Sequence, residues 1–255
     1  MFFLYFIHVE SPITDLDKPL LSRFDLEIFV NVKSVAPVSP ILHLEVKGIN
    51  HARNNPMLTS GKYLIYPGHK KVILWDNNIL ASPYWRNIFD ELEESAVEVD
   101  FNQGLDARLM TEETALRLQR LKIPIVRLAY DSKGIKESLK KTIGLLKDVG
   151  IDGRRIVVYC LYGYLDTPDD FIERIRELIT WGVVAYPMRY QPLEPCKKDS
   201  YISPNWNGEQ LEMIAKARRV IGCGGAFPPY EGLKRKFLNA RTLSEAFELK
   251  PPRPR

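Results

Sequence analysis

The sequence predicts an α/β protein built on a parallel sheet, either open or curved into a barrel. Five apolar segments rich in β-branched residues recur at intervals of 25, 28, 31 and 27 residues, which is the length of one strand, loop and helix; they start at Val72, Val97, Ile125, Ile156 and Val183. Nearly continuous apolar runs are typical of parallel strands, and the helix-like stretches between them favour right-handed crossovers. A chain of 255 residues with 45% hydrophobic content has room for one large domain of this kind.

The segment 1–60 differs from this repeat. Its apolar runs are irregularly spaced and interrupted by Pro12, Pro19, Pro37, Pro40 and Pro56. We therefore expect an atypical segment in place of a first strand–helix unit, whether through degeneration or through a shifted reading frame. Residues 1–7 are apolar but lack a basic flank and soon meet His8 and Glu10. We interpret them as a buried strand, and we expect a cytoplasmic protein with no membrane segment.

Helix signals separate the strands in order. Ser82 and Pro83 predict a helix start after the first strand, and Gly150 predicts the end of a helix with an apolar stripe at Leu139, Ile143 and Leu146. Thr167 to Asp170 predict a capped start for the next helix, which has its own stripe at Phe171, Ile175, Leu178 and Ile179. Beyond the repeat, we expect an amphipathic helix near 210–221, a basic segment at 234–236 and a disordered tail at 251–255.

The carboxyl ends of parallel strands are where such folds gather reactive groups. The first strand runs into Asp76, Asn77 and Asn78, which would hold an ammonium or hydroxyl group of a ligand or, equally, form an Asx turn. The second strand ends in a dense polar run around a glycine, and here we favour ligand contact; its candidate residues are Asn102, Gln103, Gly104, Asp106 and Arg108.

The third strand contains a charged residue, Arg127, and ends near Asp131. A charge inside an apolar strand must be paired or must line a cavity. Arg127 therefore pairs with Asp106 or Asp131, or it faces a ligand as a carboxylate fork while Asp131 accepts a ribose hydroxyl. Both interpretations remain open at this point.

The last two strand ends are aromatic. Tyr159 lies in the fourth strand, and Gly163 at its end allows close backbone approach, while Cys160 between them is interpreted as a small core residue. The fifth strand ends in Arg189, Tyr190 and Gln191 between two prolines, which suits either a pocket rim or a stiff exit loop.

These ordered strand ends, with DNN at the first and DFNQGLDAR at the second, resemble the radical S-adenosylmethionine superfamily over about residues 61–192. The resemblance implies a partial (β/α)6, TIM-like barrel over 61–195 that holds S-adenosylmethionine and a 4Fe–4S cluster and forms a 5′-deoxyadenosyl radical. It implies that residues 76–78 meet the amino group of S-adenosylmethionine and that Asp131 meets the ribose. It places adenine against the backbone of 159–163 and puts Tyr190 and Gln191 at the last strand end.

The chain departs from this family at the cluster. The family holds its cluster on a CxxxCxxC loop ahead of the DNN strand, and thiolates are the ligands that such clusters need. No cysteine precedes Cys160, and the other two are Cys196 and Cys223, so the spacing gives neither this loop nor a disulfide framework. We therefore expect a radical S-adenosylmethionine-like protein that is inactive or incomplete.

The alternative is a non-catalytic module on the same scaffold that binds a nucleoside or a nucleic acid. A basic segment, Lys234–Lys236, lies beside Tyr230 and Phe237 in a C-terminal helical extension at 196–255. The net charge of +4 neither requires nor excludes a nucleic-acid partner.

Overall fold

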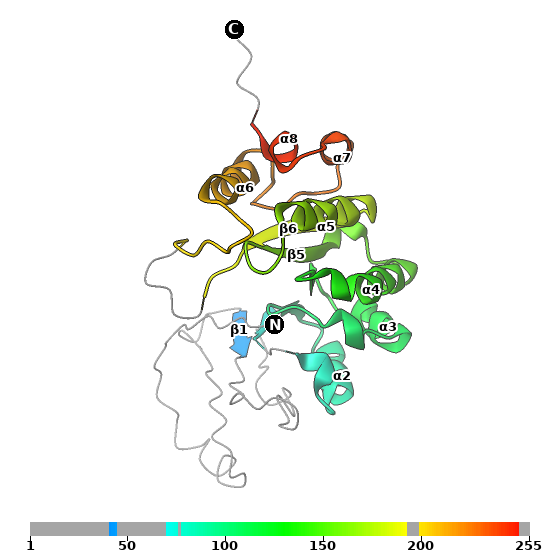
Figure 1. The fold of residues 1–255 in the computed structure, drawn as a ribbon. Helices are drawn as coiled ribbons and strands as arrows, with labels where there is room; N and C mark the ends of the chain where they lie inside the picture. Colours follow the sequence, from blue (N-terminus) through cyan, green and yellow to red (C-terminus); the bar gives the residue numbers. More distant parts are fainter. Residues whose placement is uncertain (1–40, 45–69, 76–77, 193–198, 250–255) are drawn as a thin grey trace. The chain divides into compact units, whose positions relative to one another are not determined.

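The computed structural model describes residues 41–44, 70–75, 78–192 and 199–249. They form an α/β fold with two three-stranded sheets, one in each of two compact units that divide between Val126 and Arg127 (Figure 1). The predicted α/β class with parallel strands is therefore confirmed. The strand expected at residues 1–7 and the tail at 251–255 lie outside the described residues.

The first unit contains the sheet β1–β2–β3, formed by β1 (Ile41–Leu44), β2 (Lys71–Leu74) and β3 (Glu98–Phe101). Both strand pairs are parallel, with Leu42 opposite Val72 and Val72 opposite Val99. The first two strands predicted from the repeat are confirmed as β2 and β3. In addition, β1 lies inside the N-terminal segment, where the broken apolar pattern indicated no regular unit.

Side chains along β2 and β3 point alternately to the two faces of the sheet, so one face is apolar and the other is charged. Val72, Leu74, Val99 and Phe101 are buried, and Phe101 packs against Phe89 of helix α2 (Trp85–Ser95) with ring centroids 5.7 Å apart. The other face bears Lys71, whose Nζ lies 2.9 Å from Glu98 Oε1 and 3.4 Å from Asp100 Oδ2.

The helices of the first unit begin in different ways. Helix α2 starts at Trp85, later than the Ser82–Pro83 signal suggested, because Ser82 Oγ accepts a hydrogen bond from Tyr84 N and forms a turn ahead of the helix. Helix α3 (Glu112–Arg120) is capped by Thr111, whose side chain accepts from Thr114 N. Capping of this kind satisfies an N–H group that has no partner within the helix.

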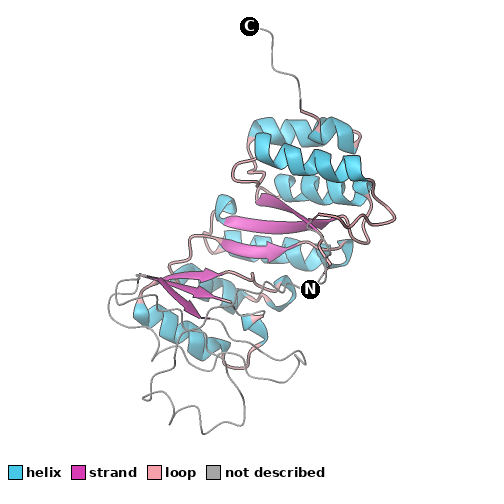
Figure 2. Ribbon diagram, turned by 90° about the vertical axis from the view of Figure 1, so that its left-hand side faces the viewer, coloured by secondary structure: helices cyan, strands magenta, loops and turns pink. Residues whose placement is uncertain are grey.

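The second unit contains the sheet β4–β5–β6, formed by β4 (Val126–Ala129), β5 (Ile156–Tyr162) and β6 (Val184–Arg189) (Figure 2). These are the third, fourth and fifth strands that the repeat predicted. β5 and β6 run parallel, with Tyr159 opposite Tyr186. Every second residue of β5 is buried, so one face of this sheet packs into the core.

Two helices join these strands, and both follow the sequence signals. Helix α4 (Lys136–Asp148) ends two residues before Gly150, which takes φ +90°. The N–H groups of Gly150 and Ile151 donate to the carbonyls of Lys147 and Leu146, as in a Schellman motif. Helix α5 (Pro168–Thr180) begins with a capping box between Thr167 and Asp170. The apolar stripes predicted for α4 and α5 are buried.

Three C-terminal helices complete the second unit: α6 (Gly208–Val220), α7 (Glu231–Asn239) and α8 (Leu243–Phe247). α5 packs on β5 and β6 and also contacts α7 and α8, so it lies between strands and helices (Figure 1). Phe227, Phe237 and Phe247 are buried together, with ring centroids 5.2–5.9 Å apart. Phe227 also exchanges backbone hydrogen bonds with Ala185 of β6. Among the described residues, no helix is both long and apolar enough to cross a bilayer.

Candidate functional site

In the first unit, the polar residues after β2 and β3 come together in part. Asp76 and Asn77 lie outside the described residues, whereas Asn78 is described and its Nδ2 donates to Asp106 Oδ2 at 3.2 Å. This bond joins the segment after β2 to the segment after β3. The predicted convergence of strand ends is therefore seen for Asn78 and Asp106.

Asp106 is held by four donors. Its Oδ1 accepts from the backbone N and the Nε of Arg108, both at 2.9 Å, and its Oδ2 accepts from Arg108 Nη2 at 2.7 Å as well as from Asn78. These bonds, led by those from Arg108, hold the pKa of Asp106 below its usual value, although burial opposes them. The Asp106 side chain is 10% exposed and that of Arg108 is 65% exposed. The pairing of Arg127 with Asp106 or Asp131 stays a prediction.

The turn after β3 presents two amide side chains. Gly104 N donates to Phe101 O at 3.0 Å, and Gly104 takes φ +83°, a left-handed conformation that favours glycine. The turn leaves Asn102 and Gln103 half-buried. Both remain candidates for ligand contact at this strand end.

In the second unit, Asp131 follows β4 directly. Its Oδ1 is buried and accepts no hydrogen bond, and burial raises the pKa of Asp131, although the positive charge of Arg174 opposes this effect. Arg127 lies half-buried within β4. A buried carboxylate oxygen without a donor is costly, so a ligand hydroxyl that donated to Asp131 Oδ1 would lower that cost.

Gly163 closes β5 with φ +78°, and a Cβ added there would lie 3.0 Å from Leu211 Cδ2 in α6. The next residue, Tyr164, stacks on Tyr190 with ring centroids 4.3 Å apart, and Tyr190 meets Tyr201 edge to face at 5.2 Å. In β5 itself, Tyr159 packs edge to face on Tyr186. Three tyrosines, Tyr164, Tyr190 and Tyr201, therefore lie together at the ends of β5 and β6.

The polar residues after β6 bind a later segment of the chain. Arg189 Nη2 donates to the carbonyls of Asp199 and Tyr201, at 2.7 and 3.1 Å. Gln191 makes two bonds with Asp199: its Nε2 donates to Oδ1 at 2.7 Å, and its Oε1 accepts from the backbone N at 3.1 Å. These two residues, predicted as ligand contacts, position the segment 199–201. Arg189 Nε is buried and has no hydrogen-bond partner.

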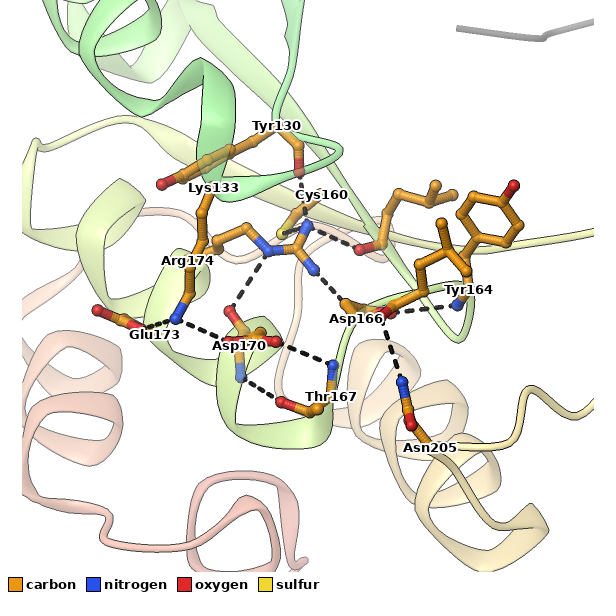
Figure 3. A network of polar contacts seen from close by, with 12 residues as sticks. Tyr130, Lys133, Cys160, Tyr164, Asp166, Thr167, Asp170, Glu173, Arg174 and Asn205 are labelled. Carbon is orange, nitrogen blue, oxygen red and sulfur yellow. Dashed lines mark hydrogen bonds and ion pairs between the residues drawn. The ribbon is translucent and has the colours of Figure 1, made fainter.

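A buried arginine that sequence reasoning missed organises the strand ends of this unit. Arg174 of α5 is 1% exposed. Its Nη1 donates to the carbonyls of Tyr130 and Leu161, at 2.6 and 2.8 Å, and its Nη2 donates to Asp166 Oδ2 at 2.5 Å (Figure 3). One guanidinium therefore ties the end of β4, the end of β5 and the loop before α5.

Asp166 extends this network into the segment ahead of α6. Its Oδ1 accepts from Tyr164 N at 3.1 Å and from Trp206 Nε1 at 3.2 Å. Asn205 Nδ2 donates to the carbonyl of Leu165 at 3.2 Å. At the outer side of α5, Lys133 pairs with Asp170 and Glu173 (Figure 3). The inner part of the network is buried and the outer part is exposed.

The described cysteines do not fit an iron–sulfur cluster. Cys160 is fully buried in β5, and burial raises the pKa of its thiol to about 12, which disfavours the thiolate that a cluster needs. Cys223 is exposed. Among the described residues, no three His, Cys, Asp or Glu side chains gather as a metal site. The prediction of Cys160 as a core residue is confirmed.

The basic segment of α7 makes local contacts. Lys234 Nζ lies 3.7 Å from Glu231 Oε1, and Lys236 Nζ donates to the carbonyls of Glu245 and Glu248 at the end of α8. Arg235 is exposed.

Comparison of the chain with family models, with curated proteins and with solved structures gives no match.

Proposed function

We propose that this protein is a radical S-adenosylmethionine-type scaffold that binds S-adenosylmethionine, or a related nucleoside, at the carboxyl ends of β4, β5 and β6. The observation that carries the proposal is Asp131, a strand-end carboxylate whose buried Oδ1 has no donor. A ribose diol supplies two hydroxyl donors to such a group. Binding of the ribose diol would offset the free-energy cost of burying that oxygen.

The neighbouring strand end supports the same ligand. Gly163 at the end of β5 is buried and packs against Leu211 of α6, so a flat base would meet the tyrosines beside it rather than this backbone. Tyr164, Tyr190 and Tyr201 provide aromatic faces and edges beside it. Purine rings pack well on such surfaces.

The partial (β/α)6 barrel is part of this proposal. It is supported by the strand–helix repeat and by parallel pairing in β1–β2, β2–β3 and β5–β6. A further support lies ahead of β4, where Lys122 forms a parallel bridge with Glu98 of β3. The chain therefore already runs alongside β3 shortly before it enters β4.

Radical chemistry is not part of the proposed activity, because Cys160 and Cys223 do not form a fitting ligand set. Among the described residues, a nucleic-acid role has no specific contact to support it, since Lys234 pairs with Glu231 of α7 and Lys236 donates to carbonyls at the end of α8. The proposed function is therefore nucleoside binding. Anaerobic reconstitution with iron and sulfide tests whether the chain binds a cluster. Absorbance from a bound cluster after desalting would contradict a function limited to nucleoside binding.

Calorimetric titration of the full chain with S-adenosylmethionine tests the binding itself. We expect a saturable heat that Asp131→Asn weakens by about tenfold, because a hydrogen bond to a charged group is worth more than one between neutral groups. We also expect weaker binding as the pH falls through the pKa of Asp131, since only the carboxylate accepts both hydroxyls. S-adenosylhomocysteine and 5′-methylthioadenosine show whether the nucleoside alone suffices.

The matched control is Asp148→Asn. Asp148 is an exposed carboxylate at the end of α4, before the chain enters β5 from its amino end, so it makes the same charge change away from the proposed site. Absence of heat for every nucleoside would refute the proposal. Equal weakening by both variants would show that net charge, rather than the strand-end carboxylate, determines the affinity.

A further inference from the structure

We propose that Arg108, in the first unit, is a pre-oriented binding residue for an anionic group with two oxygens, either a carboxylate or a phosphate. This inference does not rest on the nucleoside site proposed for the second unit. It rests on the juxtaposition of an almost buried carboxylate, Asp106, with an exposed guanidinium at the carboxyl end of β3.

Asp106 fixes the orientation of Arg108. The carboxylate has room for about four donors, and the structure supplies four: three from Arg108 and one from Asn78. Because both the backbone N–H and the side chain of Arg108 bond to the same carboxylate, the guanidinium plane is set by the turn itself. The Asp106 side chain is only 10% exposed, so it has little freedom to move.

One edge of the guanidinium remains available. Nε and Nη2 face Asp106, whereas Nη1 makes no hydrogen bond among the described residues. Glu113 in the first turn of α3 does not occupy it, because Glu113 pairs with Arg86. A planar fork with two parallel N–H groups matches carboxylate and phosphate oxygens, and holding it in place beforehand lowers the entropic cost of binding.

The surroundings of Arg108 add neutral donors. Asn102 and Gln103 lie in the same turn region, and the side chain of neither makes a hydrogen bond within the described structure. Their amide N–H groups suit an anion that Arg108 has already engaged. The turn therefore combines one fixed cation with two neutral donors at a strand end.

Titration of the ¹⁵N-arginine-labelled full chain with inorganic phosphate, and separately with acetate, tests the inference by NMR. We expect the guanidinium resonances of Arg108 to shift and to saturate with at least one anion. The anion that saturates the shift at the lower concentration shows whether the site binds a phosphate or a carboxylate. Shifts that stay linear for both anions, or that are no larger at Arg108 than elsewhere, would overturn the inference.

Arg86 is the matched internal control. It forms the same side-on fork with Glu113, at 2.7 and 2.6 Å, but Glu113 is 49% exposed and lies on a helix surface. Arg108→Gln should weaken phosphate or acetate binding by about tenfold, and Arg108→Lys should weaken it less, because lysine keeps the charge but loses the fork. Arg86→Gln should leave binding unchanged; an equal loss in the Arg86 and Arg108 variants would refute a built site. The wild-type resonances decide the question even if an Arg108 variant folds poorly.

Discussion

Replacement of Arg174 by methionine is expected to destabilise the second unit more than any change at its surface. Methionine is shorter than arginine, but it is flexible and fills much of the volume of the arginine stem, so the main effect of the substitution is the loss of the donors. It leaves the carbonyls of Tyr130 and Leu161 without their donor, and it leaves the Asp166 carboxylate, which is 11% exposed, without its countercharge. Each of these groups stays buried or nearly so after the change.

The size of the effect follows from that loss. Removing one partner of a buried ion pair costs about 3–5 kcal/mol, because the other charge remains uncompensated. Asp166 keeps its bonds from Tyr164 N and Trp206 Nε1, which favours the lower half of that range. The unpaired carbonyls act in the opposite direction, at about 1–3 kcal/mol for a buried group that loses its partner. We therefore expect a decrease of about 4 kcal/mol in the free energy of unfolding.

Hydrogen exchange followed by mass spectrometry measures this locally. Peptides from β5 and α5 report on the second unit, and peptides from α2 and α3 report on the first. Protection should fall in the β5 and α5 peptides, with a smaller change in the α2 and α3 peptides. The double variant Arg174→Met with Asp166→Asn should recover part of the loss, because it removes the uncompensated charge.

Lys133→Met is the matched control in the same network. Lys133 contacts Asp170 and Glu173 but is 52% exposed, so its loss should cost less than about 1 kcal/mol. The reasoning is refuted if Arg174→Met costs no more than Lys133→Met. It is also refuted if the double variant is no more stable than Arg174→Met, since the buried charge would then not be the cause.

Three further predictions concern single positions. Gly163→Ala should lower stability by about 1–2 kcal/mol, because φ is +78° there, whereas Gly144→Ala inside α4, where a Cβ meets nothing within 4 Å, should raise the melting temperature. A variant that keeps only Cys160 should react with a thiol reagent only after unfolding, because burial raises the thiol pKa to about 12; fast reaction of the folded chain would contradict this. Asp106 has a lowered pKa, so its stabilising effect is present above the unfolded-state pKa of about 4 and is lost as the pH falls further. When the free energy of unfolding is measured against pH, Asp106→Asn should therefore lose less stability than the wild type as the pH falls through this range. An unchanged pH dependence would contradict the stabilising role of the Asp106 carboxylate.

The sequence predicted the strands and several helix ends because their causes are local. The repeat located β2 to β6 closely, and Thr167 with Asp170 formed the capping box that their spacing predicts. The start of α2 was wrong because Ser82 forms a turn instead of capping the helix. The division of the strands into two sheets could not be predicted, since every strand pair joins residues distant in the chain.

The strand-end positions of several candidate residues were predicted, but their hydrogen-bond partners were predicted only in part. Asp131 and Gly163 lie at strand ends as expected, whereas Arg189 and Gln191 bind Asp199, a partner that no local pattern indicates. Arg174 had a signal that could have been used: it lies three residues after Phe171 on the buried stripe of α5. A charge at a core position predicts a buried pair, but it does not identify the partner.

The contacts of Arg174 have a consequence for evolution and engineering of this fold. The guanidinium of Arg174 holds the ends of β4 and β5 and the loop before α5 together through its hydrogen bonds. A substitution of Asp166 would leave the buried Arg174 without its countercharge, so we expect Arg174 and Asp166 to be replaced together in related chains. The rings of Tyr164 and Tyr190 take no part in these hydrogen bonds, so substitutions there would change the proposed binding surface while the support of the strand ends stays in place.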